Sequence, residues 1–111
     1  MQAKHLNFSH PSFRGWIGVA RHDITPPVGI YARNWGAAQH DVAEGIHRPL
    51  EAAVMTIQDE PGAAPLVLVT VDLGWWQDLD DEWHLRGGVL ENLNLDPQRL
   101  MLCASHTHAG P

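Results

Sequence analysis

Cysteine is nearly absent from this chain. Cys103 is the only one among 111 residues, so the chain cannot form an internal disulfide, and its place in an apolar run predicts a buried free thiol. Basic residues are also scarce, with 7 Lys and Arg against 13 Asp and Glu and a formal net charge of −6. Because no cluster of Lys and Arg is present to contact phosphates, we expect no nucleic-acid partner.

Long apolar runs are missing as well. No stretch reaches the roughly 18 apolar residues of a transmembrane helix, and residues 1–16 lack the apolar centre of a secretory signal. The cytoplasm is therefore the default compartment, and nothing in the composition fixes another. A hydrophobic content of 44% with 18% charged residues indicates a globular chain, and its length corresponds to one domain or part of one.

What is present is an order of segments typical of an α/β fold. Residues 1–14 predict an irregular, mobile lead-in, and residues 15–111 predict a mixed sheet made of a β-hairpin followed by a right-handed βαβ unit. The turn sequence Asp-Glu-Pro-Gly at 59–62 marks the hairpin. The expected strands cover residues 15–21, 50–58, 66–71 and 100–104, with a short helix as the alternative for 50–58, and the expected helix covers 78–93.

Two further expectations concern packing, and one concerns a loop. The continuous apolar run at 66–71 is typical of a strand covered on both faces. In the expected helix, Leu79, Trp83 and Leu90 recur at helical spacing, which predicts that this stripe packs on the sheet. Residues 31–47 show no such periodicity and predict a long loop, a kind of segment that often carries function.

The most informative segment is the last one, LMLCASHTHAGP at 100–111. His106 and His108 are two positions apart, so in an extended segment both imidazoles point to the same face. Two neutral imidazoles can there act as two metal ligands, or as one ligand and one proton-transfer group. Because a zinc site needs at least three protein ligands, the sequence predicts part of a metalloenzyme site and an incomplete domain.

Other polar and aromatic residues are candidates for the same site. Parallel strands end at the same edge of a sheet, so Asp72, directly after the strand 66–71, is expected near the two histidines. Its carboxylate either fixes a histidine tautomer or serves as an ordinary capping or loop acid. Within the loop, His47, Asn34 and Trp35 are candidates to line the site, and an ordinary solvated position is the alternative for each.

Four short motifs, in this order, resemble the neutral and alkaline (non-lysosomal) ceramidases and their bacterial relatives. The resemblance spans about residues 16–111, and the last motif is the most specific. The motifs are Gly18-Val19-Ala20 with Asp23-Ile24-Thr25-Pro26-Pro27, then Gly45-Ile46-His47-Arg48-Pro49-Leu50, then Val69-Thr70-Val71-Asp72-Leu73-Gly74, and finally Ser105-His106-Thr107-His108-Ala109-Gly110-Pro111. The ceramidase catalytic domain is far longer than this chain, so the resemblance implies its amino-terminal portion.

The resemblance implies a zinc amidase that hydrolyses the N-acyl bond of ceramide, a lipid substrate. By the matching positions, His106 is implied to be a zinc ligand and His108 to line the site near the scissile amide. The family's other ligands, a histidine, a glutamate and a tyrosine, lie in later segments. Residues 31–36 differ from the glycine-tyrosine loop usual in ceramidases, so a different amide or ester is an alternative substrate. A catalytically inactive α/β remnant that keeps the motif is the other alternative.

Overall fold

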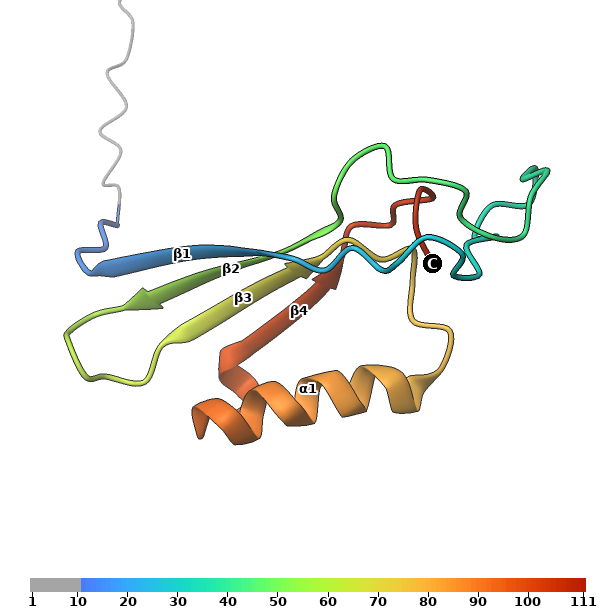
Figure 1. Ribbon diagram of the computed structural model, residues 1–111. Coiled ribbons are helices and arrows are strands. Elements are labelled where there is room, and N and C mark those ends of the chain that lie inside the picture. The colour runs from blue at the N-terminus through green and yellow to red at the C-terminus, as the bar shows by residue number, and fades with distance from the viewer. Residues whose placement is uncertain (1–10) are drawn as a thin grey trace, which may run out of the picture.

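The computed structural model describes residues 11–111 of the protein as one mixed sheet with a helix on one face (Figure 1). The sheet order is β1-β2-β3-β4, with β1, β2 and β3 antiparallel in turn and β4 parallel to β3. The elements are β1 (Trp16–Asp23), β2 (Glu51–Gln58), β3 (Leu66–Val71), α1 (Leu79–Leu93), the 3-10 helix η1 (Pro97–Arg99) and β4 (Leu100–Ala104). The expected hairpin and βαβ unit are therefore confirmed.

The expected lead-in falls mostly outside the described residues. Its last part, residues 11–14, forms neither helix nor strand, and residues 1–10 lie outside the description. In the described part, no helix combines the length and apolar character needed to cross a membrane.

Local capping explains where α1 begins and ends. The Asp78 side chain accepts a hydrogen bond of 2.9 Å from the Asp80 backbone N–H, so Asp78 is the N-cap and the helix begins at Leu79. The first turn is acidic, which the helix dipole favours. At the other end, Asn94 adopts the left-handed conformation with φ 46° and returns its N–H to the last turn, which ends the helix.

The core lies between the sheet and α1. Alternate residues of β3 point to the helix side, as the period of two along a strand requires, and they are buried there. The buried apolar residues are Val67, Val69, Val71, Leu95 and Leu100.

The opposite face of the sheet is not covered by any element within residues 11–111 (Figure 1). Leu66 is 46% exposed and Thr70 is exposed, so the prediction that this strand is covered on both faces is wrong. Cys103 pairs in register with Thr70 and shares this open face, so its thiol is exposed and the buried-thiol prediction is also wrong. An apolar run signals a strand, but it does not say how many layers pack on it.

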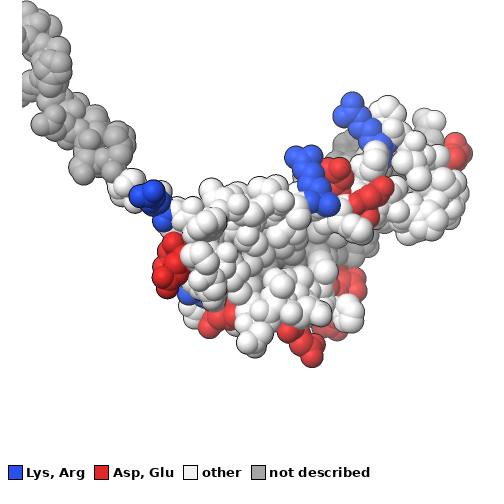
Figure 2. All heavy atoms as spheres, turned by 60° about the vertical axis from the view of Figure 1, so that its left-hand side comes forward, with Lys and Arg blue, Asp and Glu red and all other residues white. Residues whose placement is uncertain are grey.

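The open face extends across the sheet as an apolar surface. Ile17 and Val19 of β1 and Met101 of β4 are 66%, 72% and 58% exposed. On the side of the molecule shown in Figure 2, basic side chains are interspersed with acidic ones and form no continuous basic patch.

The helix contacts the core through a stripe that differs from the predicted one. Val89 and Leu90 pack against the core, whereas Leu79 is 70% exposed and Trp83 is 57% exposed. Of the predicted stripe, only Leu90 makes the expected contact. The apolar residues of α1 form a stripe broader than the predicted one, so periodicity alone does not select the part of it that packs.

A part-buried ion pair ties α1 to the start of β4. Arg86 Nε donates to Glu82 Oε1 at 2.8 Å, one helical turn away, and Arg86 Nη1 donates to the Leu100 carbonyl at 3.4 Å. The hydrogen bond that Arg86 donates to Glu82 raises the pKa of Arg86 above its ordinary value. Arg86, held by Glu82 within the helix, thus joins the crossover helix to the strand that precedes the histidine motif.

Candidate active site

The two histidines lie at the edge of the sheet where β3 and β4 both end. This follows from the parallel pairing of these strands, because β4 ends at Ala104 and the histidine motif comes directly after it. The ring centroids of His106 and His108 are 4.9 Å apart and their planes are inclined by 80°. The sequence therefore correctly predicts that the two rings are neighbours.

The backbone between the rings is not the regular extended segment that was expected. His106 has φ +61°, in the left-handed region that residues other than glycine occupy infrequently. Histidine is one of the residue types enriched there, and such conformations cluster at functional sites. A turn at His106, rather than the alternation of a strand, places its ring beside that of His108.

The two rings are close enough to act at one metal ion, either as two ligands or as one ligand with a proton-transfer group beside it. Two imidazoles bound to one tetrahedral zinc ion, with Zn–N bonds of about 2.0–2.1 Å, have ring centres roughly 5 Å apart. The observed separation of 4.9 Å matches this value. Within residues 11–111 no group of three or more His, Cys, Asp and Glu side chains could hold a metal ion, so further ligands would have to come from elsewhere.

Asn34 connects the loop after β1 to this site. His108 Nδ1 lies 3.0 Å from the backbone carbonyl oxygen of Asn34, although the two residues are 74 positions apart. Asn34 is 6% exposed, a buried position for a polar residue in a loop whose other residues are exposed or half-buried. The structure therefore brings Asn34 to the histidines, and it does so through the backbone carbonyl.

The loop is held in place by contacts within itself. Tyr31 forms an antiparallel bridge with Val42, and Ala32 N–H donates to the Asp41 carbonyl at 2.9 Å. Arg33 Nη1 also bonds to Asp41 Oδ1 at 2.8 Å, and this hydrogen bond raises the pKa of Arg33. These contacts fix the two ends of the segment that presents Asn34.

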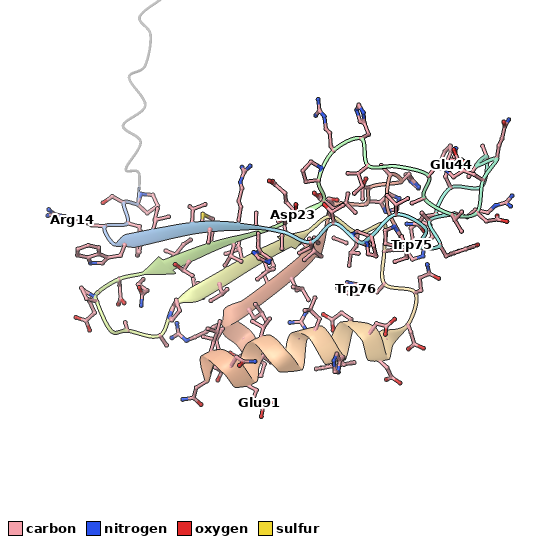
Figure 3. All side chains as sticks on the ribbon, in the orientation of Figure 1. Arg14, Asp23, Glu44, Trp75, Trp76 and Glu91 are labelled. Atoms are coloured by element: carbon pink, nitrogen blue, oxygen red, sulfur yellow. The ribbon has the colours of Figure 1, made fainter. Side chains whose placement is uncertain are left out.

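Two tryptophans stand beside the histidine rings. Trp35 meets His108 edge to face with a centroid distance of 4.8 Å, and Trp75 lies 5.8 Å from His106 and 6.0 Å from His108. Figure 3 shows Trp75 among the loops at the end of the sheet, and Trp76 between that end and α1. Trp76 packs against the core, whereas Trp35 and Trp75 are 53% and 45% exposed and give the site an apolar wall.

Asp72 is engaged with the backbone of β2. Its Oδ2 accepts a hydrogen bond of 2.9 Å from the Glu51 N–H, and its own N–H donates to the Glu51 carbonyl at 3.0 Å. No hydrogen bond joins Asp72 to either histidine in the described part of the chain. Its carboxylate therefore holds the start of β2 in this structure.

A neighbouring turn reinforces the same junction. Thr25 Oγ1 accepts from the Leu50 N–H at 2.8 Å, and Thr25 N–H donates to Asp23 Oδ1 at 2.8 Å. The hydrogen bonds from Thr25 lower the pKa of Asp23 below its ordinary value. Asp23 and Thr25 of the first motif thus join the exit of β1 to the entry of β2.

His47 lies in a pocket whose lining does not include His106 or His108. It is exposed, and the pocket, of about 270 Å³, lies between the loop after β1 and the end of the chain. Thr107 and Ala109 also line this pocket.

Gly74 is a site residue that reasoning from the sequence overlooked. A Cβ at this position would overlap the side-chain amide of Asn34 and would lie 3.2 Å from the Thr107 carbonyl oxygen. The signals in the sequence are a glycine shortly after a buried strand and its place at the end of the third motif. No protein-family model, curated protein or solved structure matches this chain, so the resemblance to the ceramidases rests on the four motifs alone.

Proposed function

We propose that this chain contributes two histidines to a zinc-dependent amidase that hydrolyses the N-acyl bond of ceramide or a related lipid amide. The observation that carries the proposal is that the His106 and His108 rings lie together, with centroids 4.9 Å apart, where two parallel strands end. The four motifs, which resemble the ceramidases in order and in residues, support zinc and an amide substrate. By the same resemblance, the remaining ligands are a histidine, a glutamate and a tyrosine outside the described residues.

The two histidines have different roles in this proposal, a division that comes from the resemblance. His106 is a zinc ligand, and His108 accepts or returns a proton near the scissile amide. Because Nδ1 of His108 is hydrogen-bonded to the Asn34 carbonyl, Nε2 is the ring nitrogen that accepts and returns the proton. The exposed faces of Trp35 and Trp75 provide apolar surface for the substrate beside the two rings.

Zinc, when bound, supplies a Lewis acid for a carbonyl oxygen and lowers the pKa of a coordinated water to about 7. Hydrolysis of an amide at neutral pH needs an activated nucleophile and stabilisation of the carbonyl oxygen, and zinc is able to supply both. A group that moves a proton to the leaving amine contributes on the order of 10²–10⁴-fold in rate.

The test uses the complete gene product, loaded with zinc and supplied with ceramide. Metal content and fatty-acid release are measured for wild type, His106→Ala and His108→Ala. His40→Ala is the control, because His40 is an exposed loop histidine. We expect His106→Ala to lose metal and activity together, and His108→Ala to keep most of the metal but lose on the order of 10²–10⁴-fold in turnover.

Three outcomes would change the proposal. If His108→Ala empties the metal site while His106→Ala does not, the two roles must be exchanged. Release of acid from simple amides or esters but not from ceramide would assign a different substrate to the same site. If hydrolysis is absent from the zinc-loaded protein, or is unaffected by both substitutions, the motif is structural and the enzymatic proposal fails.

A further inference from the structure

His108 is held in a defined orientation by the backbone of a distant loop. Its Nδ1 lies 3.0 Å from the Asn34 carbonyl oxygen, and Trp35 contacts its ring edge to face. A carbonyl oxygen can only accept a hydrogen bond, so Nδ1 must carry the proton. In the neutral ring the lone pair is then on Nε2 alone.

The position of that carbonyl depends on where the Asn34 side chain is seated. Asn34 is 6% exposed, whereas its sequence neighbours Arg33 and Trp35 are both exposed. The loop is therefore anchored locally at Asn34. An anchored side chain fixes the backbone that carries it, and here the same residue provides the carbonyl that binds His108.

Gly74 provides the space for this anchor. A Cβ at residue 74 would overlap the side-chain amide nitrogen of Asn34. It would also lie 3.0 Å from the Cγ of Asn34 and 3.2 Å from the Thr107 carbonyl oxygen. Distances of this kind force a neighbour to move. Asn34 is short and buried, and Thr107 lies between the two histidines, so any movement is transmitted to the site.

We propose that Gly74 and Asn34 are positioning residues that lock His108 in the Nδ1–H tautomer and leave Nε2 as its one free lone pair. Three segments distant in the sequence meet in this lock: the turn after β3, the loop after β1 and the segment after β4. The tautomer assignment stands on geometry alone, and its importance for hydrolysis rests on the proposed function.

The first experiment reads the tautomer directly by long-range ¹H–¹⁵N correlation NMR of the ¹⁵N-labelled chain. Spectra are recorded in alkaline buffer, where imidazoles are neutral, and His108→Gln identifies the His108 signals. We expect His108 in wild type to show the pattern of a single Nδ1–H tautomer. In Gly74→Ala we expect a shift toward the Nε2–H form that free histidine prefers.

The chain offers a matched control in Gly36, which lies two residues from Asn34 in the same loop. A Cβ at Gly36 meets nothing within 4 Å, so Gly36→Ala should leave the His108 tautomer unchanged. Asn34→Ala keeps the carbonyl but removes the anchor, and we expect it to shift the tautomer as Gly74→Ala does. In the double variant, the methyl group introduced at position 74 fills the space left by the amide, so part of the Nδ1–H form should return.

The proposal is overturned if His108 in wild type is the Nε2–H tautomer, or if Gly74→Ala leaves it in the Nδ1–H form. If Gly74→Ala fails to fold, an unshifted tautomer in Asn34→Ala overturns the proposal equally. In the complete gene product, Gly74→Ala should lower turnover on the order of 10²-fold at unchanged zinc content. If the Nδ1–H tautomer is confirmed but the wild-type protein does not hydrolyse the amide, the positioning of His108 by Gly74 and Asn34 stands and the proposed function is refuted.

Discussion

Replacing Asp72 with alanine distinguishes a structural acid from a partner of the histidines. Its Oδ2 accepts from the Glu51 N–H at 2.9 Å in a part-buried position at the start of β2. Asp72→Ala leaves this N–H without that partner. A hydrogen bond to a charged group contributes about 1.5–3 kcal/mol to stability. Because water has partial access to this site, we expect the variant to lose about 2 kcal/mol of unfolding free energy.

Asp72→Asn refines this test, because the amide keeps an oxygen that can accept from Glu51. A neutral hydrogen bond contributes about 0.5–1.5 kcal/mol, so this variant should lose about half as much stability as Asp72→Ala. Urea unfolding followed by tryptophan fluorescence measures both variants. Glu44→Ala, at an exposed loop residue, is the control and should stay within about 0.5 kcal/mol of wild type.

Two results would refute this reasoning. If Asp72→Ala unfolds at the same urea concentration as Glu44→Ala, the hydrogen bond to Glu51 does not hold the junction. If Asp72→Asn keeps its stability but loses zinc in the complete gene product, the carboxylate acts on a histidine and its role belongs to the site.

In urea titrations, Leu90→Ala should lower the unfolding free energy by about 1–3 kcal/mol and Leu79→Ala by less than about 0.5 kcal/mol. Equal losses in the two variants would refute the conclusion that Leu90 packs on the core and Leu79 does not. Cys103 should react fully with a thiol reagent without denaturant, whereas reaction only after unfolding would mean that it is covered. Because the pKa of Asp23 is lowered in the folded state, its carboxylate stabilises the fold at pH values above the ordinary Asp pKa of about 3.9. This stabilisation is lost as the pH falls through the folded-state pKa. Asp23→Asn should therefore flatten the acid side of the stability profile, and an unchanged profile would contradict this. Calorimetric titration of the 111-residue chain with zinc should show no submicromolar site, and tight one-to-one binding that survives His106→Ala would refute the proposed ligand.

Most of the fold could be predicted because its signals are local. The strands at 66–71 and 100–104 match the predicted bounds, since each is an apolar run next to residues that break a strand. The helix was predicted one residue too long at its start, where Asp78 is the cap. What the sequence could not provide was the packing of layers. The exposed thiol of Cys103 and the outward position of Leu79 both depend on what covers each surface.

The candidate site divides in the same way. The nearness of His106 and His108 was expected from their spacing, although a turn at His106 and not the alternation of a strand produces it, and their place at the sheet edge could be predicted from the parallel βαβ topology. The left-handed backbone at His106 and the seat of Asn34 against Gly74 could not. These features depend on contacts between segments that only the folded chain brings together, and no local pattern encodes such contacts.

The lengths of the connections between strands have a consequence for the order of assembly. The turn from β2 to β3 spans only residues 59–65, whereas the connections 24–50 and 72–99 close much longer loops. Closing a long loop carries a larger entropic penalty, so we expect the central hairpin to form early and β1 and β4 to join it afterwards. Asn34 and Trp35 lie in one long connection, and the histidine motif follows the other. The histidine pair can therefore acquire its geometry only at the final stage of folding, and it would be the first part of the chain to lose that geometry when β4 detaches.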